Sequence, residues 1–146
     1  MLDDITRRDP KGMSIWISDF PKQIEQAVHI GKEAKIKLNM KGIQNIVLTG
    51  LGGSAIGDDL LRSYFAEEVK VPFRINQSYV LPEFVGQNTF VIVYSYSGNA
   101  EETISAHKNA IKRKARVLCI SAGGEMAENS SSYRECAIKI GGTNQR

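Results

Sequence analysis

The stretch Gly50-Leu51-Gly52-Gly53-Ser54-Ala55-Ile56-Gly57 constrains the fold of this chain more than any other. It follows the apolar run Ile46–Thr49 and precedes a helical pattern from Asp58 to Phe65. Glycines allow a sharp turn and a close approach of a ligand to the backbone. The unpaired N–H groups and the positive dipole end at the start of a helix attract anions. The stretch therefore predicts a strand, a turn and a helix, with an anion site at the turn, most often for phosphate.

A second loop, Ser95-Tyr96-Ser97-Gly98-Asn99, follows the strongest predicted strand. Ligands of open α/β sheets bind at the carboxyl ends of strands. Two serine hydroxyls together with helix-terminal amides can surround a phosphate without a lysine. Asn99 is predicted to be the N-cap of the next helix, with Glu102 at the spacing of a capping box. Taken alone, Ser97 is equally well explained as a capping residue and Ser95 as a polar strand end.

Strands and helices alternate along the chain. We predict strands over 43–49, 71–76, 89–94, 116–121 and 135–140, and helices over 21–35, 55–66, 99–114 and 125–130. This order is typical of an α/β three-layer sandwich with a mainly parallel five-stranded sheet. We expect a single domain overall, in which an N-terminal helical segment (residues 1–40) packs on the domain formed by residues 41–146.

Composition excludes several classes of protein. The chain has 146 residues, 42% of them hydrophobic, and a net charge of +3. The one dense basic run, Lys112–Arg116, is interpreted as a solvated helix end, so no nucleic-acid partner is expected. Cys119 and Cys136 lie in apolar strand patterns and are predicted to be buried thiols, with no metal site. No secretory signal or apolar run of about 18 residues is visible, so we expect a cytoplasmic protein with no membrane partner.

Two nucleotide-binding interpretations of the glycine stretch are weak. A nucleoside-triphosphate P-loop needs a lysine where this chain has Asp58, whose carboxylate would repel the phosphates. The dinucleotide pattern G-x-G-x-x-G/A is satisfied, but it requires an acid near the end of the second strand. That strand ends in Asn76-Gln77. An NAD-binding domain therefore stays as a less favoured alternative.

Together, GLGGSAIG and SYSGNAEET resemble the paired motifs of the sugar isomerase (SIS) domain. The closer resemblance is to the first half of the bifunctional phosphoglucose/phosphomannose isomerases. It implies a flavodoxin-like SIS fold, no cofactor, and interconversion of a 6-phosphorylated aldose with its ketose. By this match the substrate phosphate is held by Gly52, Gly53, Ser54, Ser95 and Ser97.

The resemblance also shows two departures from the family pattern. The family's threonine after SYSGN is Ala100 here, so one phosphate-binding hydroxyl is missing. The terminal glycine-rich stretch resembles the one that leads to the family's active-site arginine. Arg146 would be that catalytic residue and would stabilise an enediolate intermediate, although the preceding proline is replaced by Gln145.

Isomerisation needs a base and a ring-opening acid. In the resembling enzymes these are a glutamate and a histidine from a second SIS domain, and His29 and His107 are predicted to be structural instead. We therefore expect the phosphosugar-binding N-terminal half of a glucose-6-phosphate/mannose-6-phosphate isomerase of carbohydrate metabolism, incomplete as an enzyme by itself. Its ligand would be fructose 6-phosphate, glucose 6-phosphate or mannose 6-phosphate, and its partner a second SIS domain or a second copy in a homodimer. The alternative is a non-catalytic SIS module that senses phosphosugars or mediates dimerisation.

Overall fold

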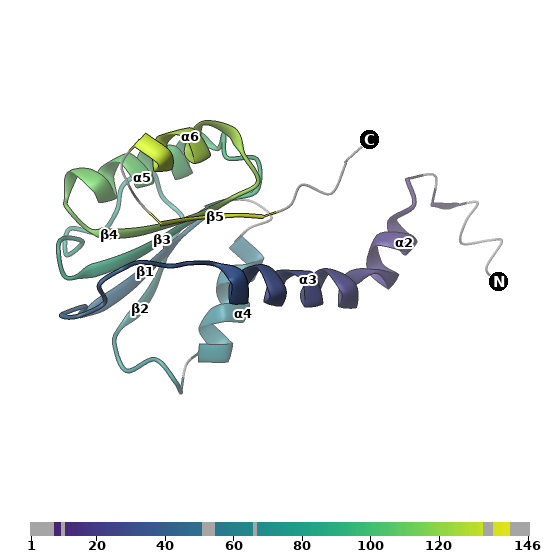
Figure 1. Ribbon diagram of the computed structural model, residues 1–146, viewed down its shortest axis with the longest axis horizontal. Helices are drawn as coiled ribbons and strands as arrows, with labels where there is room; N and C mark the ends of the chain where they lie inside the picture. The colour runs from purple at the N-terminus through teal and green to yellow at the C-terminus, as the bar shows by residue number, and fades with distance from the viewer. Residues whose placement is uncertain (1–7, 10, 51–54, 66, 133–135, 141–146) are drawn as a thin grey trace. The chain divides into compact units, whose positions relative to one another are not determined.

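The computed structural model describes residues 8–9, 11–50, 55–65, 67–132 and 136–140. Within these ranges, a helix follows each strand from β1 to β4, except that β2 leads to β3 without a helix between them (Figure 1). The elements are α2 (Met13–Ser18), α3 (Phe20–Glu33), β1 (Asn45–Thr49), α4 (Ala55–Phe65), β2 (Phe73–Asn76), β3 (Thr89–Ser95), α5 (Glu101–Lys112), β4 (Arg116–Ser121), α6 (Gly124–Ser132) and β5 (Cys136–Lys139). The predicted elements are confirmed, with small shifts at their ends.

The five strands form one sheet in the order β2-β1-β3-β4-β5, and every neighbouring pair is parallel. This confirms the predicted five-stranded sheet, and the order is that of flavodoxin-like folds. β2 lies at an edge of the sheet and begins directly after Pro72, which cannot donate a ladder hydrogen bond. β1 and β3 are neighbours, with Thr49 opposite Val93. The two loops singled out in the sequence therefore leave the same edge of the sheet side by side.

The main core lies between the sheet and the helices α5 and α6, which cover one of its faces (Figure 1). In β3 every second side chain, from Thr89 to Ser95, points into this core and is buried. The connection between β2 and β3 adds Leu81 and Val85. The buried cluster consists of Val47, Leu81, Val85, Val91, Val93, Ala106, Ala110, Val117, Cys119 and Met126. Each large side chain in it stabilises the fold by about 1.5–3 kcal/mol relative to exposure.

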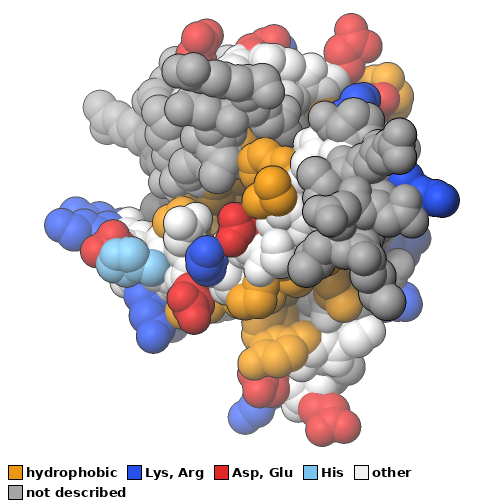
Figure 2. Space-filling model, turned by 90° about the vertical axis from the view of Figure 1, so that its right-hand side faces the viewer, with side chains coloured by type: hydrophobic (Ala, Val, Ile, Leu, Met, Phe, Trp, Pro, Cys, Tyr) orange, Lys and Arg blue, Asp and Glu red, His pale blue; other side chains and the backbone are white. Residues whose placement is uncertain are grey.

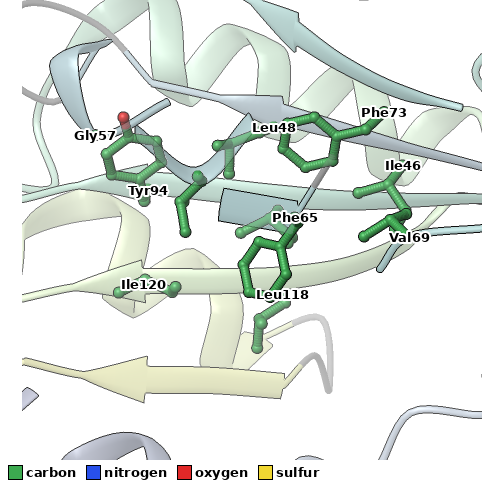
Figure 3. Close-up of a pocket in the computed structure, with 11 residues that line it drawn as sticks. Ile46, Leu48, Gly57, Phe65, Val69, Phe73, Tyr94, Leu118 and Ile120 are labelled. Carbon is green, nitrogen blue, oxygen red and sulfur yellow. The ribbon is translucent and has the colours of Figure 1, made fainter. Parts of the chain in front are cut away.

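Helix α4 lies on the opposite face of the sheet, which completes the predicted three layers (Figure 1). A cavity of about 370 Å³ lies on this face, between α4 and the central strands (Figure 3). Its lining is almost entirely hydrocarbon, from Leu61 and Phe65 of α4 and from Ile92, Leu118 and Ile120 of the sheet. Strands covered on both faces have nearly continuous apolar sequences, as β1, β3 and β4 do.

Residues 1–34 form a compact unit distinct from residues 35–146. Asp9 caps the start of α2, because its Oδ1 and Oδ2 accept the N–H groups of Met13 (2.7 Å) and Ser14 (2.6 Å). These hydrogen bonds lower the pKa of Asp9 below its ordinary value of 3.8. Helix α3 is amphipathic and has Phe20, Ile24 and Val28 exposed. Figure 2 shows hydrophobic side chains exposed among charged ones on one side of the molecule. The packing of residues 1–40 on the rest of the chain stays a prediction.

The basic run Lys112–Arg116 does end a helix, as predicted, but two of its arginines are not simply solvated. The Arg113 guanidinium donates to the carbonyl of Pro82 (2.7 Å). The Arg116 guanidinium donates to the carbonyls of Gln87 (3.1 Å) and Lys41 (2.9 Å). Both arginines therefore tie connecting segments to the end of α5 and the start of β4.

The thiol predictions are confirmed for Cys119, which is free and buried, whereas the side chain of Cys136 lies outside what the structure describes. Across the described ranges, no cluster of three or more histidine, cysteine or acidic residues could hold a metal ion. None of the helices within them has the length and apolar character needed to cross a membrane.

Candidate functional site

The candidate site is the carboxyl edge of the sheet where β1 and β3 are neighbours (Figure 1). From β1 the chain crosses to β2 on one side, and it later returns to β3 on the other side. Such a switch point leaves a crevice between the two loops, and ligands of open α/β sheets bind there. The predicted residues Ser95 and Ser97 lie at this edge. Gly52, Gly53 and Ser54 lie outside the described residues, as does Arg146.

The hydroxyl oxygens of the two serines in the second loop both accept backbone hydrogen bonds. Ser95 Oγ accepts the N–H of Gly98 (3.2 Å), and Ser97 Oγ accepts the N–H of Asn99 (3.3 Å). A hydroxyl has one proton as well as its acceptor lone pairs. Neither hydroxyl donates to another described residue, so each can donate its proton to solvent or to a ligand. Ser95 is buried and Ser97 is exposed, so they offer an inner and an outer donor.

The start of α5 adds backbone donors next to these hydroxyls. Ala100 is the N-cap residue, and no side chain caps the helix. The first N–H groups of an α-helix have no partner within the helix. Together with the positive end of the helix dipole, these groups favour an anion at this place. Thr103 is 1% exposed and its hydroxyl has no described partner, so it does not replace the hydroxyl that Ala100 lacks at the surface.

The prediction that Asn99 is the N-cap of α5 is wrong. Its side-chain Oδ1 instead accepts the N–H of Glu125 at the start of α6 (3.0 Å). The backbone of the next loop also reaches the second loop, because the N–H of Ala122 donates to Tyr96 (3.2 Å) and that of Met126 to Gly98 (3.0 Å). The loop after β4 is thus a third component of this edge, and no local sequence pattern predicts it.

Gly50, the first glycine of the pattern, packs closely against an aromatic ring. A Cβ on Gly50 would lie 2.5 Å from Cε1 of Tyr94, so the aromatic ring occupies the space that a side chain would need. Tyr94 also lines the apolar cavity together with Gly57 (Figure 3). Gly50 is therefore required by a ring 44 positions further along the chain, as well as by the turn. Tyr94 is a residue of this edge that sequence reasoning did not single out.

The nearest described charges at the start of α5 are acidic. Tyr79, in the connection after β2, hydrogen-bonds the carboxylate of Glu102, and this bond raises the pKa of Tyr79 above its ordinary value of 10.0. Acidic residues in a first helical turn stabilise the helix dipole. The Glu102 carboxylate therefore also accepts a hydrogen bond from Tyr79. This hydrogen bond connects the segment after β2 with α5.

The side chain of Asn76, at the end of β2, forms hydrogen bonds within the chain. Its side-chain amide donates to the carbonyl of Ser78 (2.8 Å) and to Thr49 Oγ1 at the end of β1 (3.4 Å). A dinucleotide site needs a carboxylate at this position to bind a ribose hydroxyl. The structure therefore gives Asn76 a role in joining two strand ends.

The two histidines that we expect to be structural lie on α3 and α5. His107 is fully buried on α5, among the side chains that face the sheet. His29 is exposed on α3, with Nε2 3.6 Å from Oε1 of Glu33. Neither histidine belongs to the loops at the carboxyl edge.

No protein-family model matches the chain. Over 112 residues, which are 77% of this chain, it is 43% identical to a bifunctional phosphoglucose/phosphomannose isomerase from Caldicellulosiruptor bescii. A protein of the same name from Thermoplasma acidophilum is 43% identical over 84 residues, or 58% of this chain. The matched stretches are 33% and 26% of those two proteins. The chain thus matches about a third or less of each.

Solved structures show the same fold at low sequence identity. A tagatose-6-phosphate ketose/aldose isomerase from Escherichia coli is 20% identical, with a TM-score of 0.58 over 69% of this chain and 30% of that one. The Vibrio vulnificus NanR protein, in complex with ManNAc-6P, is 15% identical, with a TM-score of 0.61 over 94% of this chain and 55% of that one.

The strand order and these likenesses define the fold, which the chain shares with solved phosphosugar isomerases such as the Escherichia coli enzyme. The predicted resemblance is also confirmed at the level of sequence. Over most of its length, the chain is a homologue of part of the bifunctional phosphoglucose/phosphomannose isomerases.

Proposed function

We propose that this chain is the phosphosugar-binding N-terminal half of an isomerase that interconverts glucose 6-phosphate or mannose 6-phosphate with fructose 6-phosphate. The curated relatives support the choice of reaction, because they are named for phosphoglucose and phosphomannose isomerisation. We also propose a cytoplasmic location, where sugar phosphates of carbohydrate metabolism are found.

The hydrogen bonding of Ser95 and Ser97 is the main support for this proposal. Ser95 and Ser97 each accept a backbone N–H and so direct their protons elsewhere, beside a helix start without a side-chain cap. Two hydroxyl donors and several amide donors in one place match the oxygens of a phosphate group. In the proposed complex, Gly52, Gly53 and Ser54 of the loop after β1 form the facing wall.

The proton transfer requires groups beyond this edge. Isomerisation moves a proton between C2 and C1 of the open-chain sugar through an enediolate, which needs a base and a ring-opening acid. His107 is buried in the core, which does not suit a group that must contact the sugar. We propose that a second SIS domain or a second copy of the chain supplies both groups, and that Arg146 stabilises the enediolate charge.

A phosphosugar-sensing or dimerisation module without catalysis is the second candidate. The NanR structure, which contains ManNAc-6P, aligns with 94% of this chain and so favours sensing over dimerisation alone. Binding of a sugar phosphate is common to both candidates. They differ in turnover, which the enzyme shows once the second domain is present and the sensor does not. An NAD-binding domain has less support, because β2 ends in Asn76 instead of a carboxylate.

A thermal-shift series tests the binding. We expect fructose 6-phosphate to raise the melting temperature of the chain and fructose to leave it unchanged, since stabilisation follows ligand concentration over Kd. Ser97→Ala should weaken binding about tenfold or more, because a hydrogen bond to a charged group contributes about 1.5–3 kcal/mol. Ser105→Ala, further along α5, is the matched control. No shift with fructose 6-phosphate, or an equal shift with Ser97→Ala, would contradict the proposal.

A further inference from the structure

The loops after β3 and β4 are joined through their backbones. The N–H groups of Ala122 and Met126 donate to the carbonyls of Tyr96 and Gly98, at 3.2 and 3.0 Å. We call the contact between residues 96–99 and 122–126 the loop junction. It fixes the segment that contains the outer phosphate-binding hydroxyl, that of Ser97.

Two glycines allow the loops to approach this closely. Gly98 and Gly124 have φ angles of 72° and 73°, which side chains other than glycine rarely adopt. A Cβ on Gly98 would overlap the carbonyl oxygen of Gly123. A Cβ on Gly124 would overlap the carbonyl oxygen of Ser97 and lie 2.6 Å from Asn99 Oδ1. Each loop therefore occupies the space beside the other's glycine.

Asn99 connects the junction to the candidate phosphate site through two separate groups. Its side-chain Oδ1 accepts the N–H of Glu125 at the start of α6 (3.0 Å). Its backbone N–H donates to Ser97 Oγ (3.3 Å) and so determines which lone pair of that hydroxyl is occupied. Asn99 thus contacts both the start of α6 and the Ser97 hydroxyl.

We propose that Asn99 is a positioning residue of the phosphosugar site, which acts through its Oδ1 by fixing the Ser97 loop against the start of α6. The inference rests on the proposed function and adds the loop after β4 to the site. Asn99 does not itself contact the phosphate, and its side-chain Nδ2 is not required for binding.

The test compares Asn99→Ala with Asn99→Asp. Aspartate keeps an oxygen that can accept the Glu125 N–H, but it brings a negative charge near the bound dianion. That repulsion is screened by salt, whereas a missing acceptor is not. We expect Asn99→Ala to weaken fructose 6-phosphate binding about three- to tenfold relative to the unaltered chain, at both low and high salt. Asn99→Asp should bind weakly at low salt and approach the unaltered chain at about 0.5 M salt. Asn88→Ala, just before the opposite end of β3, is the matched control.

Three results would overturn the inference. Unaltered affinity of Asn99→Ala would show that the junction is structural only. Failure of Asn99→Asp to recover at high salt would show that an oxygen acceptor at this position is not sufficient, which contradicts a role through Oδ1 alone. Unchanged hydrogen exchange of the Glu125 amide in Asn99→Ala, measured without ligand, would show that the side-chain bond does not form in solution. Absence of binding by the unaltered chain would instead overturn the proposed function, and with it the effect of Asn99 on binding.

Discussion

Ala100 stands where the motif that this sequence resembles has a threonine, and the structure gives that difference a physical meaning. It is the N-cap of α5, with extended backbone (φ −67°, ψ 117°) and no side-chain acceptor for the helix N–H groups. Alanine is a poor N-cap, whereas threonine is a good one. The same position borders the Ser95–Asn99 loop, so a hydroxyl there could cap the helix or donate to a phosphate.

Ala100→Thr should therefore strengthen the helix and the site together. We expect the free energy of unfolding to rise by about 1 kcal/mol, the usual difference between threonine and alanine at an N-cap. Fructose 6-phosphate should also bind more tightly. Urea unfolding and ligand titration measure the two effects, and Ala100→Val, which has the same shape without a hydroxyl, is the control. An equal effect of valine would show that the hydroxyl is not responsible.

Gly50 and Gly57 belong to one sequence motif but have different reasons to be glycine. An added Cβ at Gly50 would lie 2.5 Å from the Tyr94 ring, whereas at Gly57 it would only meet Tyr94 Oη at 3.9 Å. Gly50→Ala should cost about 1–3 kcal/mol of unfolding free energy, as overpacking does. The cost should shrink in a Tyr94→Ala background, which a double-mutant cycle by urea unfolding can measure. Gly57→Ala, inside α4, should be neutral or stabilising because alanine favours helices. Equal losses at both glycines would contradict this explanation.

At the scale of elements, the strands and helices follow from local patterns. The apolar run of β3 and the glycine turn before α4 predict those elements almost residue by residue. The prediction of Asn99 as the N-cap of α5 is wrong because its side chain instead bonds Glu125, 26 positions away. No local sequence pattern predicts that contact. The contact of Tyr94 with Gly50 is equally invisible in sequence. Local order is thus predictable, while the contacts that join neighbouring loops depend on strand order.

Helices α5 and α6 are connected by an ion pair whose strength depends on pH. Lys108 Nζ lies 3.0 Å from Glu125 Oε1, and this pair, with Asn129, lowers the pKa of Glu125 below its ordinary 4.5. Because the folded-state pKa is the lower one, the stabilisation is present above pH 4.5 and is lost as pH falls through the folded-state pKa. Lys108→Met should therefore destabilise the chain at pH 7 and have little effect near pH 3. Urea unfolding at both pH values measures this, with Lys112→Met as control. A constant difference across this range would contradict the assignment.

In the whole molecule, each of the two units has apolar surface that its own packing does not cover. The sheet face beneath α4 retains a cavity of about 370 Å³, and α3 exposes Phe20, Ile24 and Val28. Exposed apolar stripes on a helix are typical of a surface that packs against another one. The sequence prediction that residues 1–40 pack on the domain would account for the helix stripe.

Val28→Ser tests that prediction. If α3 packs on the domain, this substitution should lower the urea midpoint of the main unfolding transition, because buried apolar surface is lost. Gln26→Ser, which alters a polar residue of the same helix, is the control. An unchanged midpoint with Val28→Ser would show that the helix does not contribute to the stability of the domain.

We propose above all that phosphosugar binds between the loops after β1 and β3. The most direct measurement is a titration of the isotope-labelled chain with fructose 6-phosphate, followed through its backbone amide resonances. We expect the largest shifts in residues 50–54 and 95–103, with smaller ones in residues 122–126 of the loop junction. We also expect no response to fructose. Shifts concentrated at the opposite edge of the sheet, around Gln44 and Phe84, or no shifts at all, would contradict the proposal.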